Sequence, residues 1–294
     1  MSFSPASFDL PAQRDPRRRI LLVGLDGLRA DLAIDEERMP VLAALARSGT
    51  RHRMTVALPT LSGPSWATIL TGATIAEHGV QDNQFLGSEL CRTPDLLSRA
   101  FYADQRRKTF AAASWPPLID PRGFGPIIQA REEQHRAGLH RTVIRDGETH
   151  GYVPFDAEMT QHTLWALEHD TPDVCFVYLC DADESGHLHG ARSPEYAASL
   201  TRLDAHLGAL VALVDRLAAA SGDDWLLAVT SDHGHLDEGG HGGDHPLERA
   251  SFVVTHRPNG PALDWPAEVI PTEITPRLLR FLDPDGPVRP GSPD

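Results

Sequence analysis

Short apolar runs alternate with helical patterns along most of the chain. Continuous apolar segments of strand length occur at 20–25, 174–180 and 225–231, which is typical of strands buried on both faces of a parallel sheet. Segment 193–220 opens with Ser-Pro and then repeats apolar residues every three or four positions, which predicts one long helix with a buried stripe. A short amphipathic helix is expected at 39–47. This alternation predicts an α/β fold with a mostly parallel sheet.

Acidic residues follow each of the three predicted strands. The first run leads into Asp26, the second into Asp181 and Asp183, and the third into Asp232. The carboxyl ends of parallel strands gather along one edge of the sheet, where ligands bind. Carboxylates brought together there would repel unless a positive group lay between them. The pattern therefore predicts a metal site.

The spacing of histidines near these acids supports that interpretation. In "DADESGHLHG", Asp183 and His187 are four residues apart across a Ser-Gly turn and could face one ion, with Asp181 and His189 as competitors. In "SDHGHLDEGG", Asp232 is directly followed by His233, which suits a loop. Carboxylate oxygen with imidazole nitrogen favours zinc, with manganese or iron as alternatives.

The composition restricts the kinds of binding partner and the cellular location that we expect for this protein. The chain has 294 residues, and its net charge of −14 argues against a nucleic acid polymer as partner. Three cysteines are too few for a disulfide framework, and no apolar run approaches the roughly 20 residues that cross a bilayer. The first 19 residues lack the apolar core of a signal peptide, so we expect a cytoplasmic protein without membrane contact. We expect one domain at 19–283, with loosely held tails at 1–18 and 284–294.

Two hydroxyls, Thr60 and Ser62, precede Pro64 and an apolar run that predicts a helix. A hydroxyl at this place could cap the helix by accepting a backbone N–H. It could also be a nucleophile aimed at an anion that the helix N-terminus attracts. These residues alone do not decide between the two roles.

Several motifs together resemble a known group of enzymes. The segments "DGLRAD", "PTLSGPS", "TGATIAEHGVQDNQF", "DESGH" and "SDHG" occur in this order. They resemble the metal-binding segments of the alkaline phosphatase superfamily, and most closely its nucleotide pyrophosphatase/phosphodiesterase branch. The resemblance implies a three-layer sandwich, in which helices flank the mostly parallel sheet. It also implies two zinc ions and a small-molecule phosphate ester or nucleotide-type substrate.

The resemblance assigns a set of metal ligands by position. One zinc would be held by Asp26, Asp232, His233 and the oxygen of Ser62. The other would be held by Asp183, His187 and a third histidine. The segment "GGDHP" resembles the loop that supplies that ligand, which favours His245, and His241 in "GGHGG" is the alternative.

The resemblance also names the reacting groups. Ser62 occupies the family's nucleophile position, so a phosphoseryl intermediate is expected. Asn83, in "HGVQDN", occupies the position of an asparagine that binds a phosphate oxygen. The backbone N–H of Gly63 is a second candidate for stabilising phosphoryl oxygens, and Thr60 is then expected to be a turn or capping residue.

The sequence departs from the diesterase pattern in three respects. The nucleophile is Ser62 where diesterases usually have threonine, Trp66 stands where they commonly have histidine, and the chain is short. A phosphomonoesterase, phosphonate hydrolase or phosphomutase of the same superfamily is therefore the alternative. A sulfatase agrees less well, because its motif requires an arginine where Trp66 stands.

The expected preference among esters rests on charge. Asn83 offers a neutral amide and no Arg or Lys adjoins Ser62, so a singly charged diester should bind better than a dianionic monoester. Arg122 or Arg131 would reverse this preference if it folded over the site. Aromatic residues could form a stacking wall for a nucleobase, although each is more typical of the core; they are Trp66, Phe85, Trp115 and Phe124.

Overall fold

A computed structural model describes residues 16–123 and 125–286. Most of the two predicted tails, 1–18 and 284–294, lies outside these residues, as does Phe124. Within the described part, eight strands form one sheet in the order β4-β3-β5-β1-β6-β7-β2-β8. Their bounds are β1 Arg18–Leu25, β2 Thr50–Thr55, β3 Thr109–Ala113, β4 His140–Ile144, β5 Val174–Leu179, β6 Asp224–Thr230, β7 Ala250–His256 and β8 Glu268–Val269.

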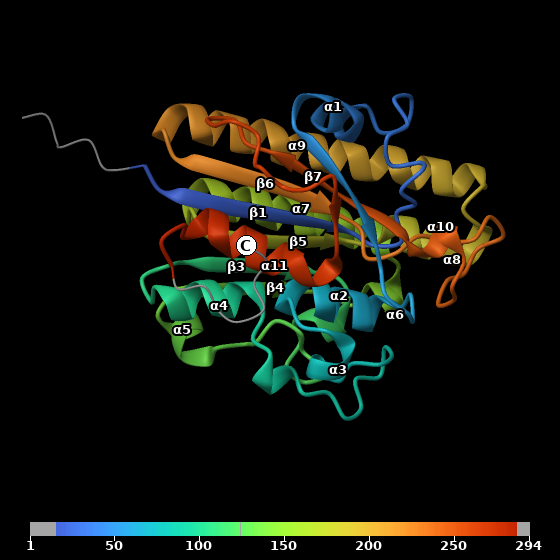
Figure 1. Ribbon diagram of the computed structural model, residues 1–294, viewed down its shortest axis with the longest axis horizontal. Coiled ribbons are helices and arrows are strands. Elements are labelled where there is room, and N and C mark those ends of the chain that lie inside the picture. Colours follow the sequence, from blue (N-terminus) through green and yellow to red (C-terminus); the bar gives the residue numbers. More distant parts are fainter. Residues whose placement is uncertain (1–15, 124, 287–294) are drawn as a thin grey trace, which may run out of the picture.

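The centre of the sheet is parallel, as the continuous apolar runs predicted. Strand β1 pairs in parallel with β5 on one side and with β6 on the other. Strand β7 runs antiparallel to both β6 and β2. Because the register sets Leu25 opposite Leu179, and Gly24 opposite Thr230, the three central strands end at one level. These ends point toward α8 and α10 (Figure 1).

Helices cover both faces of the sheet, which confirms the predicted three-layer α/β fold (Figure 1). One face is covered by α1 (Pro40–Ser48), α7 (Tyr152–His169) and α9 (Pro194–Ser221), and the other by α2 (Ser62–Thr71), α4 (Leu96–Ala103) and α11 (Pro271–Leu282). The remaining helical segments are α3 Ile75–His78, η1 Leu90–Arg92, η2 Pro116–Leu118, α5 Glu132–Arg136, α6 Gly147–His150, α8 Asp181–His189 and α10 Pro246–Arg249.

The two cores follow from the alternation of side chains along each strand. In β1, Ile20 and Leu22 join the core beneath α2 and α11, whereas Leu21 and Val23 join the core beneath α9. Successive side chains of a strand point to opposite faces. A strand buried on both faces must therefore be apolar at every position, which is why these segments read as continuous apolar runs.

Helix α9 begins where the sequence predicted. The side chain of Ser193 accepts a hydrogen bond from the backbone N–H of Tyr196 at 3.0 Å and caps the helix. By length and composition alone, α9 is apolar enough to cross a membrane. It packs against α7, α8 and β6, and its apolar stripe lies in the core. Its hydropathy therefore has the origin that the periodic pattern predicted, a buried core helix.

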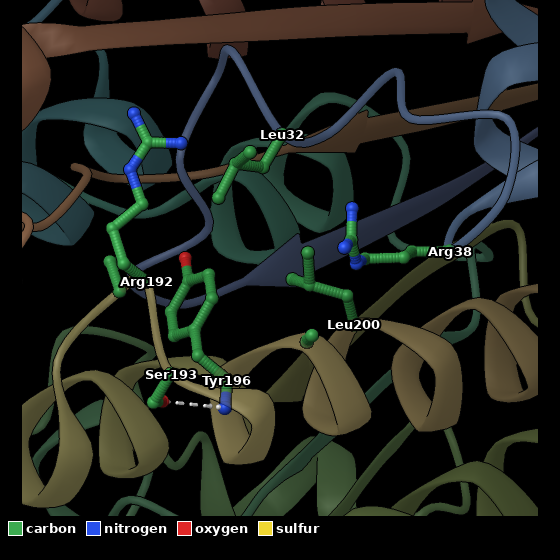
Figure 2. Close-up of a pocket in the computed structure, with 8 residues that line it drawn as sticks. Leu32, Arg38, Arg192, Ser193, Tyr196 and Leu200 are labelled. Atoms are coloured by element: carbon green, nitrogen blue, oxygen red, sulfur yellow. Dashed lines mark hydrogen bonds between the residues drawn. The ribbon is translucent and has the colours of Figure 1, made fainter.

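A small cavity of about 80 Å³ lies between the segment that follows β1 and the start of α9 (Figure 2). Leu32, Tyr196 and two arginines are among its lining residues. The arginines already have carboxylate partners, since Arg38 pairs with Asp35 and Arg192 with Asp237. Ligand sites for organic molecules usually enclose about 300 Å³ or more. This cavity is too small for a nucleotide.

Candidate active site and metal centre

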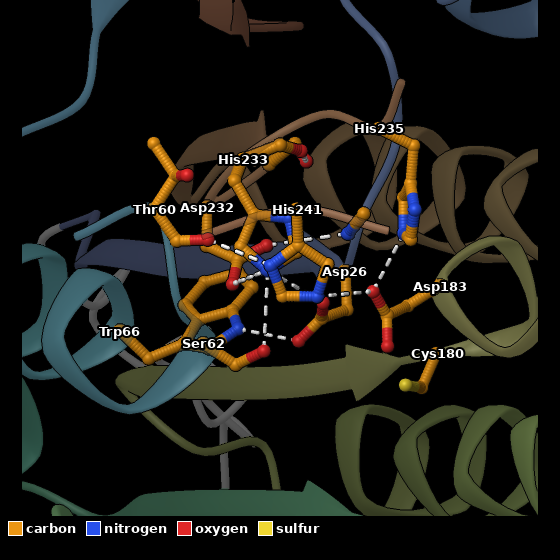
Figure 3. A network of polar contacts seen from close by, with 12 residues as sticks. Asp26, Thr60, Ser62, Trp66, Cys180, Asp183, Asp232, His233, His235 and His241 are labelled. Carbon is orange, nitrogen blue, oxygen red and sulfur yellow. Dashed lines mark hydrogen bonds and ion pairs between the residues drawn. The ribbon is translucent and has the colours of Figure 1, made fainter. Parts of the chain in front are cut away.

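The ends of the three central strands bring the predicted acidic residues together (Figure 3). Asp26 directly follows β1, Asp232 lies two residues beyond β6, and Asp183 lies in α8, which follows β5. Asp26 and Asp232 are fully buried. With His187 of α8 and three histidines from the segment after β6, these residues form two adjoining clusters of groups that could hold a metal ion, and a third group adds Cys180 to Asp26 and Asp183.

The first cluster consists of Asp26, Asp232 and His233. The Nε2 atom of His233 lies 3.6 Å from Oδ1 of Asp26 and 3.2 Å from Oδ2 of Asp232. Both of these carboxylate oxygens are buried without a hydrogen-bond donor. Buried polar atoms nearly always have a partner. Orphaned oxygens that converge on an imidazole nitrogen are what a cation site requires.

The electrostatics of this cluster lead to the same conclusion. Burial and the neighbouring charge of Asp183 raise the pKa of Asp26 to about 8. Burial and the charge of Asp26 raise the pKa of Asp232 well above its ordinary value. Burial lowers the pKa of His233 well below its ordinary value, which keeps the ring neutral. A bound cation would favour ionised carboxylates and use the neutral imidazole as a ligand. The residues fit a metal ion.

Two hydrogen-bond donors fix the orientation of Asp26. Trp66 donates its indole N–H to Oδ2 at 2.8 Å, and Tyr178 donates its hydroxyl to the same oxygen at 2.7 Å. Oδ2 is thereby occupied, and Oδ1 is left facing His233. Trp66, at the position where diesterases commonly have histidine, thus holds the Asp26 carboxylate in place through this hydrogen bond. Its indole ring packs against Phe176 and Tyr178 in the core.

The second cluster consists of Asp183, His187, His235 and His241. The Nε2 atom of His187 lies 3.5 Å from Oδ2 of Asp183 and 2.9 Å from Nε2 of His241. His241 Nε2 lies 3.5 Å from Oδ1 of Asp183. Burial acts to raise the pKa of Asp183, but the His235 hydrogen bond and the imidazoles around it hold that pKa below its usual range. Asp183 is therefore an anionic candidate ligand surrounded by imidazoles.

Asp183 and His187 lie on one face of a helix rather than across a turn, which corrects the sequence-based expectation. Helix α8 spans Asp181–His189, and residues four apart on a helix are neighbours. Asp181 and His189, the other candidates for this ion, are not part of the cluster. Asp181 accepts two hydrogen bonds from Arg202, at 2.6 and 2.9 Å, and His189 is exposed at the end of the helix.

The third histidine of this cluster is His241 and not the preferred His245. His245 is exposed at the start of α10, where its Nδ1 accepts the backbone N–H of Leu247 at 3.2 Å. Its "DHP" segment is a helix cap followed by a proline in the first turn. His241 is mostly buried and its Nδ1 lies 2.6 Å from the carbonyl oxygen of Thr60. That contact leaves Nε2 directed at Asp183.

Thr60 connects the nucleophile segment to the loop that carries His241. Its hydroxyl donates to the carbonyl of Gly243 at 3.0 Å and accepts the N–H of Gly242 at 2.9 Å. With the His241 contact, three hydrogen bonds join Thr60 to residues 241–243. The expected role as a turn or capping residue is replaced by a link between two segments that lie far apart in sequence.

Ser62 is the first residue of α2 and its hydroxyl lies at the first cluster. Its Oγ is 3.2 Å from Nε2 of His233, and the residue is 6% exposed. The capping position belongs to Leu61, which makes no side-chain cap. The hydroxyl therefore lies beside a candidate ligand at a helix N-terminus, where an anion is favoured. This is the arrangement expected of the nucleophile.

Asn83 and Gly63 form a pair. The backbone N–H of Gly63 donates to Oδ1 of Asn83 at 2.8 Å. This bond sets the amide so that its NH2 group is the part left to donate. A side chain at Gly63 would lie 2.7 Å from the carbonyl of Asp82, so only glycine fits. The N–H of Gly63 is thus engaged in holding Asn83, which corrects its expected role as a direct donor to phosphoryl oxygens.

The aromatic residues proposed as a stacking wall lie in the core where the structure describes them. Trp66, Phe85 and Trp115 are at most 5% exposed. The rings of Phe85 and Trp115 are 6.0 Å apart, and Trp115 stacks on Tyr178. They support the floor of the site and offer no exposed face for a nucleobase.

His235 was not assigned a role from the sequence, although it lies in the same "SDHGH" motif as His233. It is fully buried, and its Nε2 lies 2.8 Å from Oδ1 of Asp183. The available signal was its position two residues after His233. In an extended loop, alternate residues can point to the same side.

Comparisons with known proteins identify the family of this chain. Residues 20–256 match the family model described as type I phosphodiesterase/nucleotide pyrophosphatase. Human ectonucleotide pyrophosphatase/phosphodiesterase family member 7 is 28% identical over 273 residues, 83% of this chain and 56% of the relative. Mouse GPI ethanolamine phosphate transferase 1 is 24% identical over 278 residues, 90% of this chain and 29% of that protein. The chain thus spans about half or less of the length of these relatives.

Solved structures show the same fold. An inactive variant of murine ectonucleotide pyrophosphatase/phosphodiesterase 5 in complex with AMP matches with a TM-score of 0.65 and 16% identity, over 94% of this chain and 98% of that one. Phosphonoacetate hydrolase from Sinorhizobium meliloti 1021, in complex with phosphonoformate, matches with a TM-score of 0.54 and 19% identity, over 74% of this chain and 57% of that one. The resemblance noted in the motifs is confirmed: this chain belongs to the type I phosphodiesterase/nucleotide pyrophosphatase family.

Proposed function

We propose that this protein is a two-metal phosphodiesterase of the nucleotide pyrophosphatase type that acts through a phosphoseryl intermediate on Ser62. The observation that carries the proposal is the position of the Ser62 hydroxyl, 3.2 Å from Nε2 of His233 at the start of α2. Two clusters of carboxylates and imidazoles adjoin it. Membership of the family supports the same reaction class.

The chain offers a ligand set for each of two ions. Asp26, Asp232 and His233, with the Ser62 oxygen, would hold one ion, and Asp183, His187 and His241 would hold the other. Imidazole and carboxylate donors favour zinc, with manganese or iron as alternatives. When bound, such ions lower the pKa of oxygen nucleophiles and offset the negative charge that a phosphoryl group carries.

The residues around the ligands would bind and orient the substrate. Ser62 Oγ would attack phosphorus in line, the P–O bond to one alcohol of the diester would break, and that alcohol would leave with a proton. The phosphoryl group, still esterified to the second alcohol, would then be bonded to the serine. Asn83, held through its Oδ1 by the N–H of Gly63, keeps its NH2 group free to donate to a phosphoryl oxygen. Attack by water on this serine phosphodiester would release the phosphomonoester as the second product and restore the Ser62 hydroxyl.

The charges support a diester over a monoester. Asn83 is neutral, and the two arginines that could have changed the balance are engaged elsewhere. Arg122 pairs with Asp120, and Arg131 binds Thr109 at the amino end of β3, the opposite end of the strand from the site. A dianionic monoester would be held better by a guanidinium group. We therefore expect kcat/KM for an aryl diester to exceed that for the matching monoester by roughly tenfold or more, about 1.4 kcal/mol.

The experiment compares chromogenic substrates on pure zinc-loaded protein. An aryl phosphodiester, a phosphonate monoester, a phosphomonoester and a sulfate ester are assayed side by side, alone and after chelation. Chelation should abolish diester turnover, and zinc or manganese should restore it. Faster hydrolysis of the monoester or the phosphonate would move the assignment to those members of the superfamily.

Ser62→Ala tests the nucleophile in the same assay. The variant should lose turnover while keeping its metal content, and Ser62→Thr, which retains a hydroxyl, should keep measurable activity. Acid-quenched wild-type protein should carry the added mass of one phosphoryl group with its remaining alcohol, and this mass should be absent from Ser62→Ala. Undiminished turnover by the alanine variant would show that the Ser62 hydroxyl does not react.

A further inference from the structure

His235 is a buried histidine beside the second cluster to which the motifs assign no role. Its ring is wedged against α8. A Cβ at Gly186 would lie 2.8 Å from three of its ring atoms. On another side the ring of Tyr196 lies 6.4 Å away, centre to centre. The ring therefore has little freedom to move. Its Nε2 lies 2.8 Å from Oδ1 of Asp183 (Figure 3).

Two roles are compatible with this position. His235 could bind the metal directly through Nε2, or it could donate an Nε2–H hydrogen bond to Asp183. The partner of the other ring nitrogen, Nδ1, distinguishes these two roles. A metal-binding histidine almost always donates its other N–H to a carbonyl, a carboxylate or water, which fixes the tautomer.

Two of the neighbouring histidines show that pattern and His235 does not. His241 has its Nδ1 at 2.6 Å from the carbonyl of Thr60, and His233 has its Nδ1 at 3.2 Å from the carbonyl of Gly234. Both therefore carry their proton on Nδ1 and present a lone pair at Nε2. The Nδ1 of His235 is buried without a partner. A proton there would be a buried donor with nothing to bind, which is costly.

We propose that His235 is a positioning residue, a neutral Nε2–H imidazole that donates to Oδ1 of Asp183 and is not itself a metal ligand. This bond turns the carboxylate so that Oδ2, which lies 3.5 Å from Nε2 of His187, is the oxygen left for the ion. The inference rests on the proposed function only in requiring a metal at Asp183. It extends the site by a residue outside the motif-derived ligand set.

The tautomer can be read directly by nitrogen-15 NMR of the histidine rings in wild-type protein, metal-free and zinc-loaded. We expect His235 to show a protonated Nε2 in both states. A proton on Nδ1 of His235 in the zinc-loaded protein, with Nε2 shifted by metal, would overturn the proposal. This measurement needs no turnover. A protein that binds zinc but hydrolyses no ester would therefore refute the proposed function alone.

Two substitutions test the consequence for metal binding. His235→Gln places an amide N–H where Nε2–H lies, whereas His235→Leu removes the donor. Zinc affinity at the second cluster, measured by competition with a chromogenic chelator, should fall roughly 10- to 100-fold in the leucine variant, the usual cost of losing such a partner. The glutamine variant should stay close to wild type, and the first cluster should be unchanged in both.

His189 is exposed at the end of α8, the helix that carries Asp183 and His187, and it provides the control position. His189→Leu should leave both affinities unchanged. Circular dichroism checks that each variant is folded. The NMR result, which is obtained on wild-type protein, holds even if the leucine variant does not fold. Equal loss in His235→Gln and His235→Leu would indicate a direct ligand, and no loss in either would indicate a filler of the core. Both results would refute the proposal.

Discussion

At the scale of single residues, the site depends on side chains that hold the ligands in place. Asp26 receives two donors on one oxygen, from Trp66 and Tyr178. Each donor reduces the number of ways in which the carboxylate can turn. Partners of this kind usually contribute 10- to 100-fold to metal affinity. Sequence motifs do not reveal these two donors, because they lie in the core and far from Asp26 in sequence.

Tyr178→Phe removes one of these donors while conserving the volume of the ring. We expect the first cluster to bind zinc about tenfold more weakly, since Asp26 keeps only the indole N–H. The second cluster should be unaffected. Chelator competition measures both affinities, and Tyr102→Phe, at an exposed ring, is the control. Unchanged zinc affinity would show that Tyr178 does not orient Asp26.

The ligands themselves differed in how well the sequence predicted them. Asp26, Asp183 and Asp232 could be located because each follows an apolar run that can only be a buried strand. The sequence favoured His245 over His241 although both lie in a glycine-rich segment without periodicity, so nothing in the local pattern could correct that preference. What separates them is the contact of His241 with Thr60 and the capping position of His245. Both are properties of the folded loop.

At the scale of elements, α8 shows how a tertiary contact overrides a local pattern. Its sequence, "DADESGHLH", has no apolar periodicity and contains a glycine, which is why a turn was expected. The helix begins under Asp156 of α7, whose carboxylate accepts the N–H groups of Cys180 and Asp181 at 2.9 Å each. A cap supplied by another helix cannot be read from the segment itself.

The link between Thr60 and the loop at 241–243 is also a property of elements. Thr60→Val keeps the shape of the side chain and removes the hydroxyl that binds Gly242 and Gly243. We expect zinc binding at the second cluster to weaken, because the loop that carries His241 loses two of its three bonds to Thr60. A loss of roughly 1–3 kcal/mol in the free energy of unfolding should accompany it.

Thr93 provides the comparison, since its hydroxyl is buried without a hydrogen-bond partner. Thr93→Val should leave zinc affinity unchanged and should leave the unfolding midpoint in urea unchanged or higher, since it removes a buried polar atom that has no partner. If Thr60→Val behaves like Thr93→Val in both measurements, the Thr60 hydroxyl does not hold the loop.

The segment that carries Asn83 is held by a neutral histidine. The Nδ1 of His78 accepts the N–H of Val80 at 3.1 Å, and its Nε2 lies 3.0 Å from the hydroxyl of Thr68. Burial lowers the pKa of His78 to about 4. Because the folded pKa lies below the unfolded value of about 6.5, the unfolded chain binds more protons between these values. His78 therefore contributes stability above pH 6.5 that is lost as the pH falls toward 4.

We expect hydrogen exchange at Val80 and its neighbours to accelerate between pH 6.5 and 4, after correction for the intrinsic rate. His140, whose pKa burial lowers to about 3, lies at the opposite end of the sheet and should add to the global loss of stability without affecting this segment. His78→Gln should make exchange of the segment less dependent on pH. An unchanged pH dependence in that variant would exclude His78 as the cause.

At the scale of the whole molecule, the two clusters bring together parts of the chain that lie far apart in sequence. The candidate ligands come from the ends of β1 and β6, from α8, from the start of α2 and from the loop at 241–243. The architecture that gathers them was predictable, because buried parallel strands have an unmistakable apolar signature. The contacts between the gathered segments depend on side-chain directions that no single-sequence pattern contains.

We expect this arrangement to make the stability of the fold depend on metal. Without a cation, Asp26 and Asp232 are buried with orphaned oxygens, which burial of polar groups penalises. An ion that binds only the folded state stabilises it by RT ln(1 + [L]/Kd), about 2.7 kcal/mol at a hundredfold excess over Kd for each site. We therefore expect chelation to lower the unfolding midpoint and zinc to raise it with concentration.

Asp183→Asn separates the contributions of the two sites, because it removes the anionic group of the second cluster and keeps all three residues of the first, although it also removes a charge that raises the pKa of Asp26. In this variant we expect zinc to raise the unfolding midpoint by only part of the wild-type shift, with about one ion bound per chain in place of two. Calorimetric unfolding against free zinc, with metal content by elemental analysis, measures both quantities. The pKa of Asp183 is held low, so the substitution replaces an ionised carboxylate by a neutral amide. The stabilisation by zinc that is lost should therefore be the full contribution of that site. A zinc-dependent shift equal to that of wild type would mean that Asp183 does not bind metal, and the two-ion assignment would then fail.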